Sequence, residues 1–236
     1  MDFVPGRDLK EIMVEARLAG RFLPESEVLD WALQLADALD YLHRQEPPIV
    51  HRDIKPSNLK LTPSGLLKLV DFGLVKLLAA DERTVTIVQG LGTAHYTPLE
   101  QYGGDTGHTD ARADVYALGA TLYHLLTNEP PVEAKLRFLR PESLKPVRAW
   151  NASISASTER AVLWALALHP DSRPPDIAAL RAALQDRGGL NVRTEGEIIT
   201  VQPTIRLPAL PTAFDRYLAL TAGGLMIMAL VLTLFR

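Results

Sequence analysis

The sequence of 236 residues contains no cysteine, which excludes a disulfide framework, thiolate metal ligands and a thiol nucleophile. Any chemistry of the chain must therefore come from carboxylates, amines, amides, hydroxyls and imidazoles. The sequence also lacks low-complexity tracts, and 47% of its residues are hydrophobic and 22% are charged. This composition is typical of a globular protein and excludes a wholly disordered or collagen-like chain.

A strong excess of basic residues is missing as well, because the formal net charge is −3. The part from Gly188 onward carries four basic and three acidic residues, so the part before it has a net charge of −4. Nucleic-acid-binding domains usually present a dense basic surface. The charge therefore argues against nucleic acid as a partner.

One long hydrophobic run is present near the carboxyl end, at residues 217–235. It has 19 uncharged residues, of which 15 are apolar. As a helix it would be about 28 Å long, close to the roughly 30 Å thickness of a bilayer core. We expect a single transmembrane helix; the alternative is a buried core helix. Three arginines between Gly188 and Arg216 precede the run and only Arg236 follows it, so we expect the bulk of the chain to face the cytoplasm.

The chain before this run divides into a helical body and a linker. Residues 188–215 contain three prolines and no helical periodicity, and we expect a juxtamembrane linker there. In the body, apolar spacings of 3 and 4 predict a helix that Pro24 opens and that runs through Leu42. Further helices are expected over about residues 114–126, 157–168 and 176–185. Residues 58–61 and 67–70 predict a short β-hairpin. The expected fold class is mainly α.

Two motifs flank the predicted hairpin. The sequence HRDIKPSN occupies residues 51–58, and DFG occupies residues 71–73. Either motif alone would be a weak signal, but their order and separation make a strong one. Phosphoryl transfer from ATP needs a carboxylate to accept a hydroxyl proton, an ammonium group near the phosphate and oxygen ligands for Mg²⁺. The residues that offer these groups are Asp53, Lys55, Asn58 and Asp71.

With these motifs the chain resembles the carboxyl-terminal lobe of a bacterial-type Ser/Thr protein kinase, over residues 1–187. The resemblance implies that Asp53 is the catalytic base and that Lys55 is the lysine typical of Ser/Thr kinases. It further implies that Asn58 and Asp71 bind Mg²⁺ and contact ATP. The implied function is ATP-dependent phosphorylation of Ser or Thr in protein substrates, as part of signalling.

The resemblance also assigns structural roles. Thr93 would belong to the substrate-docking loop, and Asp114 would anchor the backbone of the catalytic loop. Arg173 would pair with Glu100, although the proline of the family's A-P-E stands one place earlier here. We expect His51 to be a packed core histidine, not an acid or base.

A regulatory role is implied for Arg52, which would contact a phosphate on the activation segment. The candidate acceptors are Thr84 and Thr86. The alternative is that both are ordinary loop threonines.

Part of the family's nucleotide site is absent from the sequence. No G-x-G-x-x-G precedes His51, and Lys10 is the only lysine before Lys55. Met1 and Phe3 resemble the hinge between the two lobes and would contact the nucleotide. We therefore expect the amino-terminal lobe to be absent, through a misplaced start or a fragmentary gene. The chain by itself is expected to have little or no kinase activity.

Two other interpretations stay open. One is a membrane-anchored, pseudokinase-like binding module, and the other is a gene fragment without a stable product. The expected partners are a protein substrate and, through residues 217–235, the lipid bilayer. A dimer is a further possible partner. Gly223 and Gly224 give little support for it, because they are adjacent and lack the G-x-x-x-G spacing of paired membrane helices.

Overall fold

The computed structural model describes residues 4–72, 76–77, 93–102 and 110–186. The chain divides into two units, Met1–Leu190 and Asn191–Arg236, and every described residue belongs to the first. Among the described residues no helix is both long and apolar enough to cross a membrane. Several predictions lie outside the described residues: those for Met1, Phe3, Thr84, Thr86, the linker 188–215 and the span 217–235.

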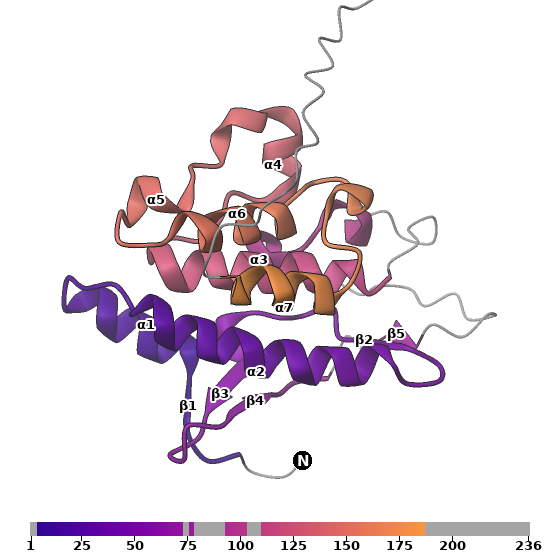
Figure 1. Cartoon of the computed structure of the whole chain (residues 1–236), viewed down its shortest axis with the longest axis horizontal. Helices are drawn as coiled ribbons and strands as arrows, with labels where there is room; N and C mark the ends of the chain where they lie inside the picture. Colours follow the sequence, from indigo (N-terminus) through magenta and orange to yellow (C-terminus); the bar gives the residue numbers. More distant parts are fainter. Residues whose placement is uncertain (1–3, 73–75, 78–92, 103–109, 187–236) are drawn as a thin grey trace, which may run out of the picture. The chain divides into compact units, whose positions relative to one another are not determined.

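The described part of the chain is mainly helical, as expected from the sequence (Figure 1). The α-helices are α1 (Leu9–Leu18), α2 (Glu25–His43), α3 (Arg112–Thr127), α4 (Ala134–Leu139), α5 (Val147–Trp150), α6 (Ala156–Ala165) and α7 (Ile177–Gln185). The strands are β1 (Arg7–Asp8), β2 (Ile49–Val50), β3 (Leu59–Leu61), β4 (Leu67–Leu69) and β5 (Lys76–Leu77). Short 3-10 helices include η1 (Pro56–Asn58), η2 (Ala94–Tyr96), η3 (Leu99–Tyr102), η5 (Pro141–Ser143) and η6 (Pro170–Ser172).

Helix α3 forms the middle of the core. It is apolar on nearly all sides and buried over most of its length, the pattern of a helix that other elements surround. It packs against α2, α5, α6 and α7. It lies close to α6 at Gly119, where an added Cβ would be only 2.6 Å from the Cβ of Ala165. The glycine therefore permits the contact between these two helices.

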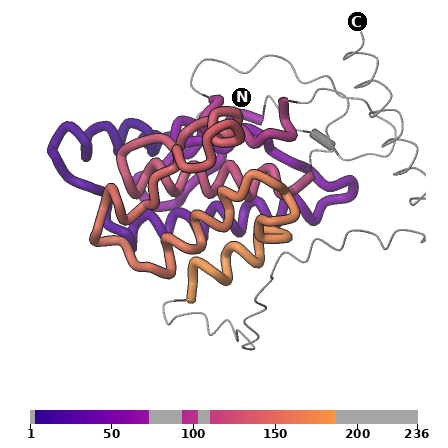
Figure 2. Tube along the Cα trace, turned by 90° about the horizontal axis from the view of Figure 1, so that it is seen from above, coloured from indigo at the N-terminus to yellow at the C-terminus, as the bar shows by residue number. Residues whose placement is uncertain are grey.

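Helix α2 connects the helical core to the small sheet. The predicted apolar stripe is buried at Val28, Ala32, Leu35 and Leu39, and Pro24 stands at the N-cap, so this prediction is confirmed. The helix packs against α3 and α7, and it also contacts β4. Figure 1 shows β1, β3 and β4 below α2 and helices α3 to α7 above it, and Figure 2 shows the chain from a second direction.

The predicted hairpin is formed by β3 and β4. Their register is antiparallel, with Leu59 opposite Leu69 and Leu61 opposite Leu67. The turn includes Gly65 with a φ of +80°, a conformation that glycine adopts without steric cost. A third strand, β1, pairs antiparallel with β3 and completes a sheet of order β1-β3-β4, while β2 pairs with β5 in a second sheet.

The sequence prediction missed the strands β1, β2 and β5 and the helices α1, α4 and α5. Helix α1 buries only Leu9, Met13 and Ala16, so its apolar pattern is too short to stand out. Its start is nevertheless marked, because the Asp8 carboxylate accepts a hydrogen bond from the backbone N–H of Glu11 at 2.8 Å. Helices α4 and α5 have six and four residues, too few for a periodic signal.

Candidate active site

The loop that begins at His51 is attached to helix α3 by one carboxylate. Asp114, in the first turn of α3, accepts hydrogen bonds from the backbone N–H groups of His51 and Arg52, each at 2.8 Å. Asp114 is completely buried. Arg52 has a φ of +69°, a left-handed conformation that costs a non-glycine residue about 1–3 kcal/mol. The two hydrogen bonds help to hold the loop in this conformation.

His43 is a member of this group that the sequence analysis missed. It is the last residue of α2, and its Nε2 lies 2.9 Å from the Oδ2 of Asp114. Seventy-one positions separate the two residues, and no local motif connects them. Asp114 therefore joins the end of α2, the start of α3 and the loop that carries Asp53.

The carboxylate of Asp53 is held by two neighbours. The ammonium group of Lys55 donates to both oxygens of Asp53, at 2.9 and 2.7 Å, and to the hydroxyl of Thr93 at 3.1 Å. The amide group of Asn58 donates to the Oδ2 and to the backbone carbonyl of Asp53, both at 2.9 Å. All the N–H donors of the Lys55 and Asn58 side chains are used in these contacts. The orientation of Asp53, which is 6% exposed, is thereby fixed.

The hairpin brings the DFG motif next to this group. The backbone N–H of Val70 donates to the carbonyl of Asn58 at 2.9 Å, which extends the pairing of the two strands by one residue. Asp71 comes directly after Val70, is exposed to solvent and has a φ of +67°. The ring of Phe72 lies edge-on to His51, with 4.9 Å between the ring centroids. The two motifs that the sequence places on either side of the hairpin therefore meet at its base.

The chemistry of these side chains fits a magnesium ion shared with a nucleotide. The amide oxygen of Asn58 is not needed for its bonds to Asp53, and Asp71 offers an exposed carboxylate. Mg²⁺ prefers such oxygen ligands and usually takes only one or two from the protein when phosphates supply others. Within the described ranges no group of three or more His, Cys, Asp or Glu side chains could hold a metal.

His51 is packed in the core, as the sequence analysis expected. It is completely buried, and burial lowers the pKa of its imidazole, although the nearby carboxylates of Asp114, Asp53 and Asp71 raise it. Its Nδ1 accepts the backbone N–H of Asp53 at 3.4 Å. The Nε2 has no hydrogen-bond partner among the residues that the structure describes.

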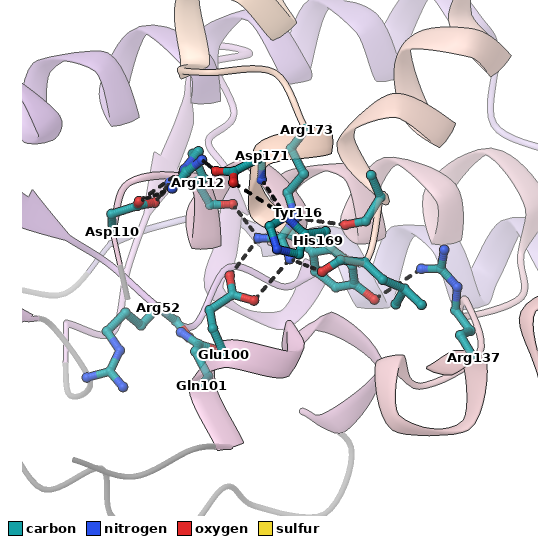
Figure 3. Close-up of polar contacts among 12 residues, drawn as sticks. Arg52, Glu100, Gln101, Asp110, Arg112, Tyr116, Arg137, His169, Asp171 and Arg173 are labelled. Carbon is teal, nitrogen blue, oxygen red and sulfur yellow. Dashed lines mark hydrogen bonds and ion pairs between the residues drawn. The ribbon is translucent and has the colours of Figure 1, made fainter. Parts of the chain in front are cut away.

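Glu100 and Arg173 form a bidentate ion pair, although Pro98 stands one place earlier than the proline of the family's A-P-E motif. The guanidinium nitrogens of Arg173 lie 2.6 and 3.0 Å from the two oxygens of Glu100 (Figure 3). The remaining N–H groups donate to the backbone carbonyls of Ala167, Leu168 and Arg112, at 2.8, 2.9 and 3.1 Å. The side chain of Arg173 is 0% exposed, and all five of its donors are satisfied.

A second arginine beside this pair had no signal in the sequence. Arg112 contacts the carboxylate of Asp110 at 2.7 Å and that of Asp171 at 2.6 Å (Figure 3). These hydrogen bonds raise the pKa of the guanidinium further and lower the pKa of both carboxyl groups. The contact with Asp171 spans 59 positions and ties the start of α3 to η6.

The backbone carbonyl of Arg52 accepts a hydrogen bond from the amide group of Gln101 at 3.4 Å (Figure 3). Arg52 is 8% exposed, and burial lowers the pKa of its guanidinium. Thr84 and Thr86 lie outside the described residues, so the expected phosphate contact stays a prediction.

Stability should depend on pH through His124, on helix α3. Burial, and to a lesser degree the nearby side chains of His95, Arg17 and Lys10, lower its pKa to about 4. Burial also raises the pKa of Tyr96, so its hydroxyl stays protonated, and it forms a hydrogen bond of 2.6 Å with the Nδ1 of His124. Between pH 6.5 and about 4 the unfolded chain binds a proton at this residue that the folded chain does not bind. Acidification through this window therefore lowers the free energy of unfolding.

The matched variant is His124→Gln, which keeps an acceptor for the Tyr96 hydroxyl and cannot titrate. Between about pH 7 and pH 4, the free energy of unfolding of the unmodified chain should fall by about 1–3 kcal/mol more than that of the variant. Urea unfolding followed by tryptophan fluorescence at several pH values measures the difference. Two curves that stay parallel over the window would contradict the prediction.

The comparisons with known proteins match this chain to protein kinases. The family model described as "Protein kinase domain" matches residues 1–181. Serine/threonine-protein kinase PknB of Mycobacterium leprae is 32% identical over 190 residues, which cover 78% of this chain and 29% of that protein. Serine/threonine-protein kinase PknB of Mycolicibacterium smegmatis is 34% identical over 191 residues, with the same two shares of 78% and 29%. The chain spans less than a third of the length of these curated relatives.

Proposed function

The chain belongs to the protein kinase family and is similar to bacterial Ser/Thr kinases, and on that premise we propose that it serves ATP-dependent phosphorylation of Ser or Thr in protein substrates. The observation that supports this most is the carboxylate of Asp53, which Lys55 and Asn58 hold at the base of the hairpin that ends in Asp71. Nucleic acid is not an expected partner.

Each side chain has a separate task in the proposed reaction. A bound ATP supplies the phosphoryl group, and Mg²⁺ neutralises its developing charge. Asp53 accepts the proton of the substrate hydroxyl. Asn58 orients Asp53 through its amide hydrogens, and its amide oxygen and the carboxylate of Asp71 would hold the ion. Lys55 fixes Asp53 to Thr93, so that the base and the neighbouring loop keep one geometry.

Nucleotide binding tests this proposal without requiring turnover. The change is Asp71→Asn, which removes a charge and keeps a residue that tolerates a positive φ. We expect the affinity for a fluorescent ATP analogue to depend on Mg²⁺ and to fall about tenfold in the variant, because one charged ligand is lost. The control is Asp37→Asn, an exposed carboxylate that pairs with Arg181. Equal affinities for the two variants, or binding that ignores Mg²⁺, would overturn the proposal.

We further propose that these residues comprise only the hinge and the carboxyl-terminal lobe. The sequence before His51 has neither a Gly-rich loop nor a lysine other than Lys10 to position the phosphates. Transfer of labelled phosphate to a basic protein should therefore stay far below the roughly 1–100 s⁻¹ of ordinary kinases. Turnover at such rates would refute this. If genomic sequence upstream adds the missing strand and lysine, the longer protein should be active; nucleotide binding without transfer in that protein would instead favour a pseudokinase-like module.

We also propose that residues 1–187 are held at a membrane through the linker 188–215 and a span at 217–235. The support is the uncharged run itself and the arginines before it. In a bacterial host the chain should sediment with membranes and resist alkaline extraction, whereas a chain ending at Arg187 should be extracted. Release of both chains by alkali would contradict the proposed span. Protection of residues 1–187 from protease added outside spheroplasts would support the cytoplasmic orientation.

A further inference from the structure

A hollow lies beside the Asp53 group. It has a volume of about 270 Å³ and is bordered by the loop after His51, helix η2 and helices α1 and α3. Its lining includes Lys10, Lys55, Ser57, Thr93, His95 and His124. Lys55 is shared between this pocket and the candidate active site, since its ammonium also contacts Asp53 at 2.7 Å. The pocket therefore begins one side chain away from the proposed base.

The donors of this pocket can be assigned from their partners. The Nδ1 of His124 forms a hydrogen bond of 2.6 Å with the Tyr96 hydroxyl, and its Nε2 has no partner among the described residues. Lys10 is exposed in the first turn of α1, and its ammonium makes no ion pair within the described ranges. The Nδ1 of His95 donates to the carbonyl of Pro131 at 2.9 Å, and this bond fixes its ring. The pocket thus presents an ammonium group and an imidazole nitrogen.

The charge of the pocket has one sign. None of its lining residues in the described part of the chain is acidic. Asp53 contacts the lining residue Lys55, and Glu129, which precedes the lining residue Pro130, contacts Arg17, both at 2.7 Å. The chain as a whole carries a net charge of −3, so attraction of an anion here cannot be a property of the overall charge.

We propose that this pocket binds an anionic side chain of the peptide substrate, a glutamate, aspartate or phosphoserine near the residue to be phosphorylated. The inference rests on the proposed function and specifies its substrate class. An extended peptide advances about 3.3 Å per residue, so a pocket that begins at Lys55 is within reach of positions up to about three residues from the acceptor. An anion there gains a charge-assisted hydrogen bond from Lys10, and the imidazole of His124 borders the same space.

Peptide binding to the full chain tests the proposal. The probes are four sets of fluorescent peptides, each with one serine acceptor. Within three positions on either side of that serine, the sets carry glutamate, phosphoserine, glutamine or lysine, respectively. We expect the glutamate or the phosphoserine peptides to bind about tenfold more tightly than the glutamine peptides, and the tighter of the two identifies the preferred anion. Fluorescence anisotropy gives the dissociation constants. The measurement needs no phosphoryl transfer, so its failure is distinguishable from failure of the proposed function.

The variant is Lys10→Glu, which places an acidic residue in the first turn of α1, where the helix dipole favours it. It should abolish the preference for anionic peptides and improve binding of the lysine peptides, an inversion that mere loss of structure would not produce. The matched control is Lys68→Glu, the same charge reversal at an exposed position of β4, which should leave the preference unchanged. Equal effects of the two variants, no preference in the unmodified chain, or no binding up to about 1 mM peptide would each overturn the proposal.

Discussion

Replacing Arg173 by methionine is expected to lower the free energy of unfolding by about 3–5 kcal/mol. Methionine fills a similar length but has no charge and no donors. The carboxylate of Glu100, whose two oxygens lie 2.6 and 3.0 Å from the guanidinium, would lose its only ion-pair partner within the described residues. Three backbone carbonyls would lose a donor at the same time. Removing one member of a buried pair leaves the other charge uncompensated, which is why the expected loss is large.

Urea unfolding of the two chains at neutral pH measures this loss. The matched control is Arg181→Met, because Arg181 is 44% exposed and its partner Asp37 is 60% exposed. A solvent-exposed pair of this kind contributes about 0–1 kcal/mol. If both variants lost the same small amount of stability, the buried pair would not stabilise the fold as argued.

Replacing Asp114 by alanine should have a comparable effect, about 2–5 kcal/mol, for two reasons. The change leaves the backbone N–H groups of His51 and Arg52 without their acceptor, and each buried, unsatisfied donor costs about 1–3 kcal/mol. It also removes the contact that holds Arg52 at its positive φ and the contact with His43. Part of this cost should appear locally, as a looser loop around Asp53.

Hydrogen exchange distinguishes this local effect from general destabilisation. The amides of His51 and Arg52 should exchange faster in Asp114→Ala under conditions in which the core of α3 stays protected. The comparison variant is Asp176→Ala, since Asp176 also accepts one backbone N–H, at the N-cap of α7. Loss of such a surface cap costs about 1 kcal/mol. Equal losses in the two variants, with slow exchange at His51, would contradict the role given to Asp114.

The sequence predicts those parts of the fold that local patterns determine. Helix α2 has five apolar residues in helical spacing, and the hairpin has turn residues between two short apolar runs, so the residues alone locate both elements. The hairpin also places Asp71 beside Asn58, because antiparallel strands of equal length return the chain to its starting point. Short elements such as β1 could not be predicted, since their pairing depends on strands more than 50 positions away.

The residues of the candidate site likewise fall into those that the sequence could identify and those that it could not. The motif residues could be identified from their order, whereas His43, Arg112 and the basic pocket could not, because they meet their partners only through tertiary packing. Their partners lie 59 and 71 positions away for Arg112 and His43, and no local pattern encodes such distances. The roles of the motif residues themselves stay predictions that the experiments above address.

Helix α3 carries both Asp114 and His124, and this has a consequence for substrate spacing. Ten helical residues advance about 15 Å along the helix axis. The rigid helix therefore fixes the separation between Asp114, which holds the loop after His51, and the imidazole of His124 in the pocket. Point substitutions at Lys10 or His124 can change which side chain the pocket accepts. An insertion in α3 would instead rotate His124 by about 100° per residue around the helix axis and separate it from the pocket. If the pocket selects substrates as proposed, its selectivity can therefore vary readily in charge, but hardly in distance.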